Sequence, residues 1–216
     1  MGNFLTVYES EAEWLKAREK YITGTGASAI LGMNPYKTNV EYFTEKLSGI
    51  VSEVPENQFM RYGKEAEPLL RNLFRLDYPE YAVSYEPNNL WTNDKYPWGA
   101  ASLDGWLLGE DGKWGILEIK TTEILKSQQR EKWNERIPDN YYIQVLHYML
   151  ILEADFAILK AQLKSRFGGE TYIQTKHFKI EREEVREDLQ ILEEKERQFA
   201  EALKEKKRPP LILPPL

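Results

Sequence analysis

The alternation of apolar and polar residues predicts strands in the middle of the chain and helices on either side. The segments rich in apolar and aromatic residues are separated by glycine, asparagine and aspartate, which favours turns between them. The predicted strands are residues 81–85, 100–108, 114–120, 156–163 and 171–180. Glu110-Asp111-Gly112-Lys113 has the composition of a hairpin turn and would join the second strand to the third.

Helix boundaries are marked by capping residues. Ser10 with Glu13, and Thr38 with Glu41, are capping boxes that predict helix starts, and Gly49 suits the end of the second helix. The predicted helices are residues 11–18, a short helix that ends at Gly32, 38–49, 56–77 with an interruption or kink near Pro68, 123–134, 140–152 and 183–206. The proline-rich tail 208–216 is not expected to be helical throughout.

The order of these elements predicts an α/β protein with a central mixed sheet flanked by helices. A length of 216 residues fits one domain with a substantial core. We expect a single domain made of a helical part at about 1–80, a catalytic sheet with helices at about 81–180, and a C-terminal helix and tail at about 181–216.

The composition limits the chemistry that the chain can carry. There is no cysteine and there are only two histidines, which excludes disulfides, iron–sulfur clusters, thiolate zinc sites and histidine-rich metal sites. A metal ion would have to be held mainly by oxygen, which suits Mg²⁺, Mn²⁺ or Ca²⁺. We find no apolar run of about 18 residues and no signal peptide, so we expect a protein of the reducing cytoplasm.

The formal net charge of −6 by itself argues against nucleic-acid binding, because phosphate contacts need lysine and arginine. The argument has little force for a metal-dependent enzyme. A metal site needs clustered carboxylates, and a local basic channel can exist on an acidic protein.

Glu118 and Lys120 form the pattern that most needs a chemical explanation. They are two residues apart in the apolar segment Ile116-Leu117-Glu118-Ile119-Lys120, so a strand places both on one face. About three acid-x-Lys matches are expected by chance, so the pattern alone is only a hypothesis. The other matches, Asp111/Lys113, Glu193/Lys195 and Glu205/Lys207, lie in a turn or on a charged helix, where solvated charge explains them.

Asp104 lies on the preceding predicted strand, on the same face as Ser102. A hairpin through Asp111-Gly112 would bring Asp104 close to Glu118. One interpretation is a turn at Asp104 and a simple ion pair between Glu118 and Lys120. The other is a divalent-metal site, with two carboxylates and the Ile119 carbonyl as ligands and Lys120 acting on water or phosphate.

Asp104…Glu118-Ile119-Lys120 resembles the core of the PD-(D/E)XK nuclease superfamily, although Leu103 stands where the name has proline. Further segments resemble the YqaJ and lambda-exonuclease branch, in the order of that family. They are Trp14-Leu15-Lys16-Ala17-Arg18 with Ala27-Ser28-Ala29, Arg61-Tyr62-Gly63-Lys64-Glu65-Ala66-Glu67, and Gln144-Val145-Leu146-His147-Tyr148-Met149. The resemblance therefore runs from about residue 14 to 150.

The resemblance implies roles at the matching positions. Glu67 would lie near the metal, and fits the spacing from Gly63 better than its competitor Glu65. Gln144 would position a water or a phosphate. Three residues would hold the 5′-phosphate of the degraded strand: Arg18, Ser28 and Ser102. Met60 is a candidate apolar wedge that would separate the two bases of the terminal base pair, although ordinary helix packing explains it equally well.

The resemblance also implies an activity. It is the Mg²⁺-dependent exonucleolytic degradation of double-stranded DNA from 5′ to 3′, with Mn²⁺ as a possible substitute, leaving a 3′ single-stranded tail. The implied setting is phage or prophage recombination in a bacterial host, with a single-strand annealing protein as partner and a ring trimer as assembly. The alternatives are another enzyme of the superfamily, such as an endonuclease or a Cas4-like exonuclease, a non-catalytic DNA-binding module, and a structural protein with a chance ion pair.

Overall fold

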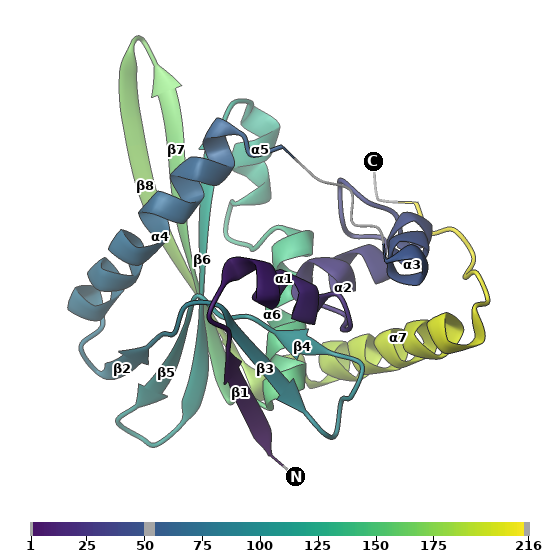
Figure 1. Cartoon of the computed structure of the whole chain (residues 1–216). Coiled ribbons are helices and arrows are strands. Elements are labelled where there is room, and N and C mark those ends of the chain that lie inside the picture. The colour runs from purple at the N-terminus through teal and green to yellow at the C-terminus, as the bar shows by residue number, and fades with distance from the viewer. Residues whose placement is uncertain (1, 50–54, 214–216) are drawn as a thin grey trace.

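The computed structural model describes residues 2–49 and 55–213. Its elements follow one another along the chain as shown in Figure 1. They are β1 (Asn3–Val7), α1 (Glu11–Arg18), α2 (Gly24–Ile30), α3 (Asn39–Ser48), α4 (Gln58–Asp77), β2 (Tyr81–Ser84), β3 (Asn89–Asn93), β4 (Ala100–Ala101), β5 (Gly105–Gly109), β6 (Trp114–Ile124), α5 (Ser127–Lys132), α6 (Asp139–Leu152), β7 (Phe156–Phe167), β8 (Glu170–Glu181), the 3-10 helix η1 (Arg182–Val185) and α7 (Arg186–Glu205).

A five-stranded sheet with the strand order β2-β5-β6-β7-β8 forms the centre of the molecule. β6 and β7 are parallel, and the other neighbouring strands of this sheet are antiparallel. The segment that carries α5 and α6 connects the two parallel strands, as a parallel pair requires. The expected mixed sheet flanked by helices is therefore confirmed.

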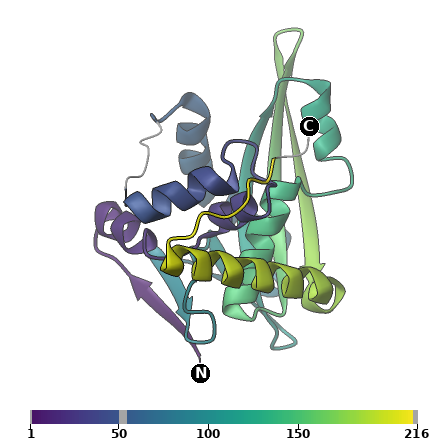
Figure 2. The same ribbon diagram turned by 90° about the vertical axis from the view of Figure 1, so that its right-hand side faces the viewer.

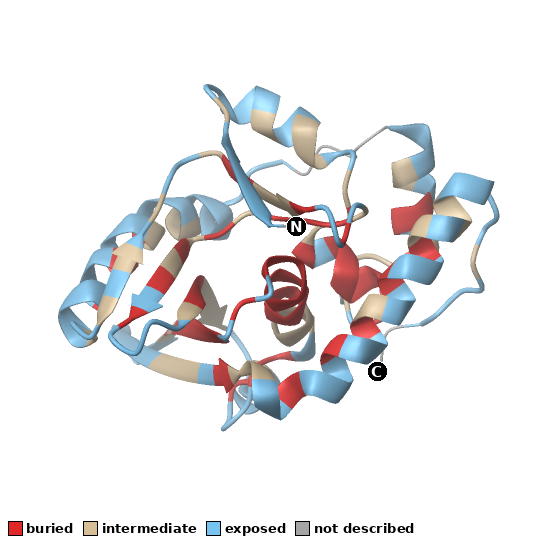
Figure 3. Ribbon diagram, turned by 90° about the horizontal axis from the view of Figure 1, so that it is seen from below, coloured by how far each residue is buried: buried red, intermediate tan, exposed pale blue. Residues whose placement is uncertain are grey.

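Each face of this sheet is covered by one main helix. α6 packs on one face, where Leu146 and Met149 are fully buried against Ile116 of β6. α4 packs on the other face, where Leu70 and Phe74 bury Leu117. Viewed from below, α6 is buried along most of its length in the middle of the molecule (Figure 3). β6 is thus the central strand, enclosed on both faces.

The N-terminal helices and α7 form a second packing region beside α6. Tyr42 of α3 stacks on Phe199 of α7 with ring centroids 5.5 Å apart, and Phe43 meets the same ring edge-on. α2 packs against α6, and α7 crosses α6 (Figure 2). This arrangement ties the two ends of the chain to the helix that covers the sheet.

A small antiparallel sheet with the order β1-β3-β4 was not expected from the sequence. All five residues of β1 are exposed, so no alternation of burial marks the strand. β3 begins and ends with a buried asparagine, Asn89 and Asn93, residue types that usually indicate turns. Both strands exist because they pair with each other over five residues.

The predicted continuous strand 100–108 is wrong. β4 ends at Ala101 and β5 begins at Gly105, and the two strands belong to different sheets. The Asn89 side chain holds the connection in place at Leu103. It accepts a hydrogen bond from the Leu103 amide at 2.8 Å and donates one to the Leu103 carbonyl at 2.9 Å. Ser102 and Asp104 therefore lie in a connection between sheets and not on one face of a strand.

The predicted helix 123–134 begins too early. β6 continues to Ile124, and the helix α5 covers only Ser127–Lys132. The register of β6 with β7 extends to the pair Ile124↔Ser165, so tertiary pairing holds residues 121–124 in the sheet. The hairpin of β7 and β8 is also longer than expected, and it projects beyond the rest of the sheet in Figure 1.

Most of the remaining predicted elements agree with the structure. α4 runs through Pro68 without a break, so the expected interruption there is wrong, while the helices at α1, α3, α6 and α7 are confirmed. The tail is non-helical as far as Leu213, and its residues 214–216 lie outside the described residues. Within the described ranges, none of the helices combines the length and the apolar character needed to cross a membrane.

Candidate active site

Glu118 lies at the centre of a buried polar cluster on β6. The residue is only 1% exposed. Its Oε1 lies 2.5 Å from the Nζ of Lys120 and accepts a hydrogen bond of 2.8 Å from the Nε2 of Gln144 on α6. Its Oε2 is buried without a hydrogen-bond partner. The strand alternation that was read from the sequence therefore does place Glu118 and Lys120 together, and α6 adds Gln144.

Asp104 reaches the same part of β6 from the connection between the two sheets. Its Oδ2 accepts a hydrogen bond of 2.8 Å from the Ile119 amide, the residue between Glu118 and Lys120. The structure thus brings Asp104 beside the Glu118–Lys120 segment, as expected, although by a different route from the predicted hairpin strand.

Glu67 joins this group from α4 through an arginine that sequence reasoning missed. Arg71, one turn further along α4, is 5% exposed and donates to Glu67 Oε1 at 2.9 Å and to the Asp104 carbonyl at 2.8 Å. Its guanidinium also lies 3.4 Å from the ring centroid of Tyr85. The competing residue Glu65 lies on the exposed side of α4. The spacing Glu67-x-x-x-Arg71 was the signal available in the sequence.

The electrostatics of the cluster follow from burial and from repulsion between carboxylates. Burial raises the pKa of Glu118 to about 8, and the charges of Asp104 and Glu67 add to this while Lys120 opposes it. Burial, with the charge of Asp104, raises the pKa of Glu67 to about 7. The pKa of Asp104 is raised by burial, against the effects of Lys120, the Ile119 amide and Arg71. Burial alone would lower the pKa of Lys120, but Glu118 and Asp104 raise it.

These shifts predict a pH dependence for the metal-free protein. A carboxyl group whose pKa is raised from about 4.5 to about 8 holds its proton in the folded state while the unfolded state loses it. The folded state then binds more protons, so the free energy of unfolding falls as pH rises through this window. We expect the melting temperature in EDTA to fall between about pH 5 and pH 8. Glu118→Gln should flatten the curve, and an unchanged slope would contradict the assignment.

The residues of the cluster fit a hard divalent cation. Three carboxylates and one buried carboxylate oxygen without a partner are the type of ligands that Mg²⁺ and Mn²⁺ take. Among the described residues, no three histidine, aspartate or glutamate side chains converge closely enough to form a ready metal cage. Instead, Glu118 pairs with Lys120 and Glu67 pairs with Arg71. A cation would have to compete with these two internal partners.

Two of the three predicted phosphate-binding residues contact one tryptophan. Trp14 Nε1 donates to Ser102 Oγ at 3.2 Å, and the Arg18 guanidinium carbon lies 4.3 Å from the Trp14 ring centroid. The Nε of Arg18 is buried and has no hydrogen-bond partner. Burial has the largest effect on the pKa of Tyr148 and raises it. The charge of Arg18 acts in the opposite direction and lowers this pKa. Because Tyr148 accepts a hydrogen bond from Gln144, Arg18 lies near the cluster.

Ser28 and Met60 are less directly connected to this cluster. Ser28 is buried in α2, donates to the Thr25 carbonyl at 2.8 Å and accepts from Asn34 Nδ2 at 3.2 Å. Met60 is 41% exposed on the first turn of α4, next to Phe59, which is 43% exposed. Exposure of Met60 is compatible with a role as a wedge, which stays a prediction.

α2 nevertheless approaches the cluster closely at its first residue. A Cβ atom on Gly24 would lie 2.6 Å from the Gln144 Cγ and 2.9 Å from Tyr148 Cε1. Only glycine therefore allows the backbone of α2 to lie against the part of α6 that carries Gln144. The position of Gln144, and with it the hydrogen bond to Glu118, depends on this contact.

Comparisons with known proteins find a family model and relatives that match this chain. The model of the YqaJ-like viral recombinase domain matches residues 13–155. The curated protein YqaJ of Bacillus subtilis (strain 168) is 28% identical over 164 residues, which are 76% of this chain and 49% of that protein. The chain thus spans about half the length of this curated relative.

Solved structures show the fold. The alkaline exonuclease LHK-Exo from Laribacter hongkongensis matches with a TM-score of 0.65 at 18% identity, over 91% of this chain and 94% of that chain. A phage related exonuclease from Haemophilus somnus 129PT matches with a TM-score of 0.50 at 14% identity, over 93% and 91% of the two chains. The PD-(D/E)XK fold class is therefore confirmed. Because the family model covers more than half of the chain, including β2, β5, β6 and the cluster around Glu118, the chain belongs to the YqaJ-like viral recombinase domain family.

Proposed function

We propose that the protein is a Mg²⁺-dependent 5′–3′ exonuclease of double-stranded DNA that leaves 3′ single-stranded tails for phage-type recombination. The observation that carries the proposal is the buried Glu118 carboxylate. Its Oε1 contacts Lys120 and Gln144, and its Oε2 has no hydrogen-bond partner. A strand that buries an unsatisfied carboxylate oxygen is unfavourable unless a ligand compensates for it. Family membership supports a role in recombination, and the fold of the exonucleases supports a nuclease.

Asp104, Glu118, the Ile119 carbonyl and Glu67 would hold Mg²⁺, for which Mn²⁺ could substitute. When bound, such an ion lowers the pKa of water and neutralises charge on the phosphate. Lys120 lies beside Glu118 and remains protonated, so it can stabilise the charge that develops on a phosphate oxygen. Gln144 donates to Glu118 and could orient a water molecule with its carbonyl oxygen.

The test of this function is the digestion of end-labelled linear duplex with and without Mg²⁺. An exonuclease degrades the linear duplex and leaves a covalently closed circle intact. Cleavage of the circle would favour an endonuclease. The absence of cleavage on both substrates would favour the non-catalytic DNA-binding module. The absence of cysteine already counts against an iron–sulfur enzyme of the Cas4-like kind.

Direction of degradation depends on how the DNA end is held, and we propose that Arg18, Ser28 and Ser102 bind the 5′-phosphate. The Nε of Arg18 is buried and has no hydrogen-bond partner, and an anionic ligand would satisfy it. LHK-Exo has been solved in complex with dAMP, and an arrangement of this fold that holds a nucleotide is in line with the proposal.

A preference for phosphorylated ends is expected from this pocket. Duplexes with a 5′-phosphate should be degraded at least tenfold faster than duplexes with a 5′-hydroxyl, because a charge-assisted hydrogen bond contributes roughly 1.5–3 kcal/mol. Arg18→Ala should remove most of the difference, whereas Lys16→Ala, an exposed cation on the same helix, should leave it unchanged. Equal rates of the wild type on both substrates would contradict the pocket.

We further propose that the protein acts as a ring of three subunits around DNA, with a single-strand annealing protein as partner. A closed ring retains its substrate without strong phosphate binding, which suits a chain of net charge −6. Light scattering should give the mass of a trimer, and product lengths in the presence of excess unlabelled DNA should show processive degradation. A monomer that releases DNA after each cut would remove the ring and leave the proposed active site standing.

A further inference from the structure

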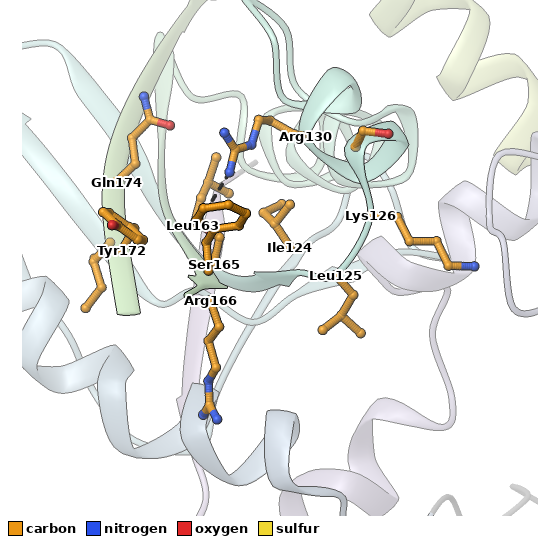
Figure 4. A pocket seen from close by; sticks show the side chains of 12 residues that line it. Ile124, Leu125, Lys126, Arg130, Leu163, Ser165, Arg166, Tyr172 and Gln174 are labelled. Atoms are coloured by element: carbon orange, nitrogen blue, oxygen red, sulfur yellow. Dashed lines mark hydrogen bonds between the residues drawn. The ribbon is translucent and has the colours of Figure 1, made fainter. Parts of the chain in front are cut away.

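A groove of about 620 Å³ lies where the long hairpin of β7 and β8 projects beyond the sheet. The end of β6, the start of α5 and the two strands of the hairpin surround it (Figure 4). Neither the family resemblance nor the catalytic cluster accounts for this feature. It would be costly to expose such a surface without a ligand, because the groove contains several large apolar side chains.

The floor of the groove continues the catalytic face of β6. Side chains alternate along a strand, so Glu118, Lys120 and Ile124 share one face. Ile124 pairs with Ser165 of β7, and Ser165 pairs with Tyr172 of β8, so these three also share that face. Ile124 lies four residues along the strand from Lys120, a distance of about 13 Å. An unpaired strand that separates from the duplex at the catalytic site can therefore pass directly into the groove.

The groove is basic although the protein is acidic. Its lining includes Lys126, Arg130 and Arg166, and none of the twelve lining residues is a carboxylate. Arg130 lies above the floor, where its Nη2 is 3.4 Å from Ser165 Oγ (Figure 4). The third lining cation, Arg166, alternates with Ser165 along β7, so its side chain points to the other face of the sheet, where it pairs with Glu123 at 3.4 Å (Figure 4). Lys126 and Arg130 are therefore the lining cations available to an external anion. In a chain of net charge −6, this local excess of cations favours a polyanion.

Aromatic rings stand next to these cations. Phe167 is 80% exposed and Tyr172 is 51% exposed, and both belong to the face that carries Ser165. The hydroxyl of Tyr172 donates to Glu170 Oε2 at 2.7 Å. Exposed aromatic rings beside cations are the surface that binds unpaired nucleotides, because the rings stack on bases and the cations neutralise phosphates.

We propose that this groove binds the unpaired DNA strand that is produced at the active site, so that it is a single-strand track beside the catalytic centre. The proposal rests on the proposed nuclease function for the origin of that strand. A duplex fits the chemistry less well, because its base faces are already stacked and only its phosphates would be recognised. A protein partner would not need two cations with no carboxylate among the lining residues.

Strand binding can be measured without catalysis, by the fluorescence anisotropy of a labelled oligothymidylate of about 12 nucleotides in EDTA. Lys126→Ala with Arg130→Ala should lower the slope of log affinity against log salt by about 1.4, which corresponds to two lost phosphate contacts. The control is Arg186→Ala with Arg197→Ala, which removes the same charge from exposed positions on α7. The control should bind like the wild type.

Stacking is tested by a second variant and a second ligand. Tyr172→Ala should weaken binding of the oligothymidylate by about tenfold, because stacking on one base is lost. An abasic oligonucleotide of equal length cannot stack, so its affinity should be the same for the wild type and Tyr172→Ala. Tyr172→Phe, which keeps the ring, should bind the oligothymidylate like the wild type.

Unchanged single-strand affinity and salt slope in both groove variants would overturn the track. A loss of affinity for duplex but not for the single strand would overturn it as well. These results are distinguishable from failure of the nuclease proposal, which is decided by cleavage of linear duplex by the wild type. Groove binding without cleavage would leave the groove as a single-strand site but overturn the active site as the origin of the strand, and cleavage without groove binding would leave the nuclease in place and overturn the track.

Discussion

Glu118→Gln is expected to reduce Mg²⁺-dependent cleavage of linear duplex by at least about 10²–10³-fold, the cost of removing one preorganised electrostatic group. Glutamine keeps the shape of the side chain and can still contact Gln144, but it carries no negative charge for a cation. The protein should stay folded, because the substitution removes a buried charge that two neighbouring carboxylates repel. Single-turnover rates at saturating DNA, with thermal melting as the check on folding, measure both effects.

Lys120→Ala should cause a loss of similar size, since it removes the cation that lies 2.5 Å from Glu118. Lys113→Ala is the matched control, because Lys113 also follows an acid by two residues but stands in the exposed hairpin turn. Mg²⁺ binding by calorimetry separates the two roles: Glu118→Gln should weaken it, whereas Lys120→Ala should retain it. Near-normal turnover by folded Lys120→Ala would contradict the assigned catalytic site.

His147→Leu is expected to destabilise the fold by about 3–5 kcal/mol, because it leaves the Glu196 charge buried and unpaired. His147 and Glu196 are both fully buried, and Nδ1 of His147 lies 2.6 Å from Glu196 Oε1. The Nε2 of His147 lies 3.0 Å from the Ala100 carbonyl, which can only accept, so Nε2 carries a proton. At about 2–4 °C per kcal/mol, the melting temperature should fall by roughly 6–20 °C.

The double variant His147→Leu with Glu196→Leu should recover most of this loss, because no charge remains buried. The pair also predicts a pH dependence. Burial alone lowers the pKa of His147, but Glu196 and the backbone carbonyls of Ala100 and Ile22 together outweigh burial and raise it. Stability from the charged pair is then fully present below the unfolded pKa of about 6.5 and is lost as pH rises through the raised folded value. If His147→Leu melts at the same temperature as the wild type, the His147–Glu196 pair does not stabilise the fold.

The contacts of His147 also affect the active site, because His147 and Gln144 both lie on α6. His147 lies one turn from Gln144, and its contact with Ala100 holds α6 against the strand that precedes Ser102 and Asp104. Glu196 also accepts a hydrogen bond from Trp98 at 3.2 Å. His147 thus has a buried partner, Glu196, on α7, and this contact ties α6 to α7.

Local sequence patterns were enough to predict the central strand and its chemistry. Glu118 and Lys120 stand out because strand alternation places both on one face of an apolar segment, and this depends only on residues close in sequence. The N-cap of Ser10, the capping box of Thr38 with Glu41, and Gly49 mark the first and third helices for the same reason, since these caps bond within one turn. The roles of Gln144, Glu67 and Arg18 came from the ordered family motifs, because nothing in their local sequence distinguishes them from surface residues.

Tertiary structure decided what depends on partners far apart in the chain. The exposed strand β1 forms because β3, more than 80 residues later, supplies its hydrogen bonds. The connection at Ser102 and Asp104 leaves the strand because Asn89 binds Leu103 and the Ile119 amide binds Asp104. Arg71 gains its role only when α4 lies against that connection. The groove beyond Lys120 exists because pairing with β7 extends β6 to Ile124 and aligns residues that no local pattern connects.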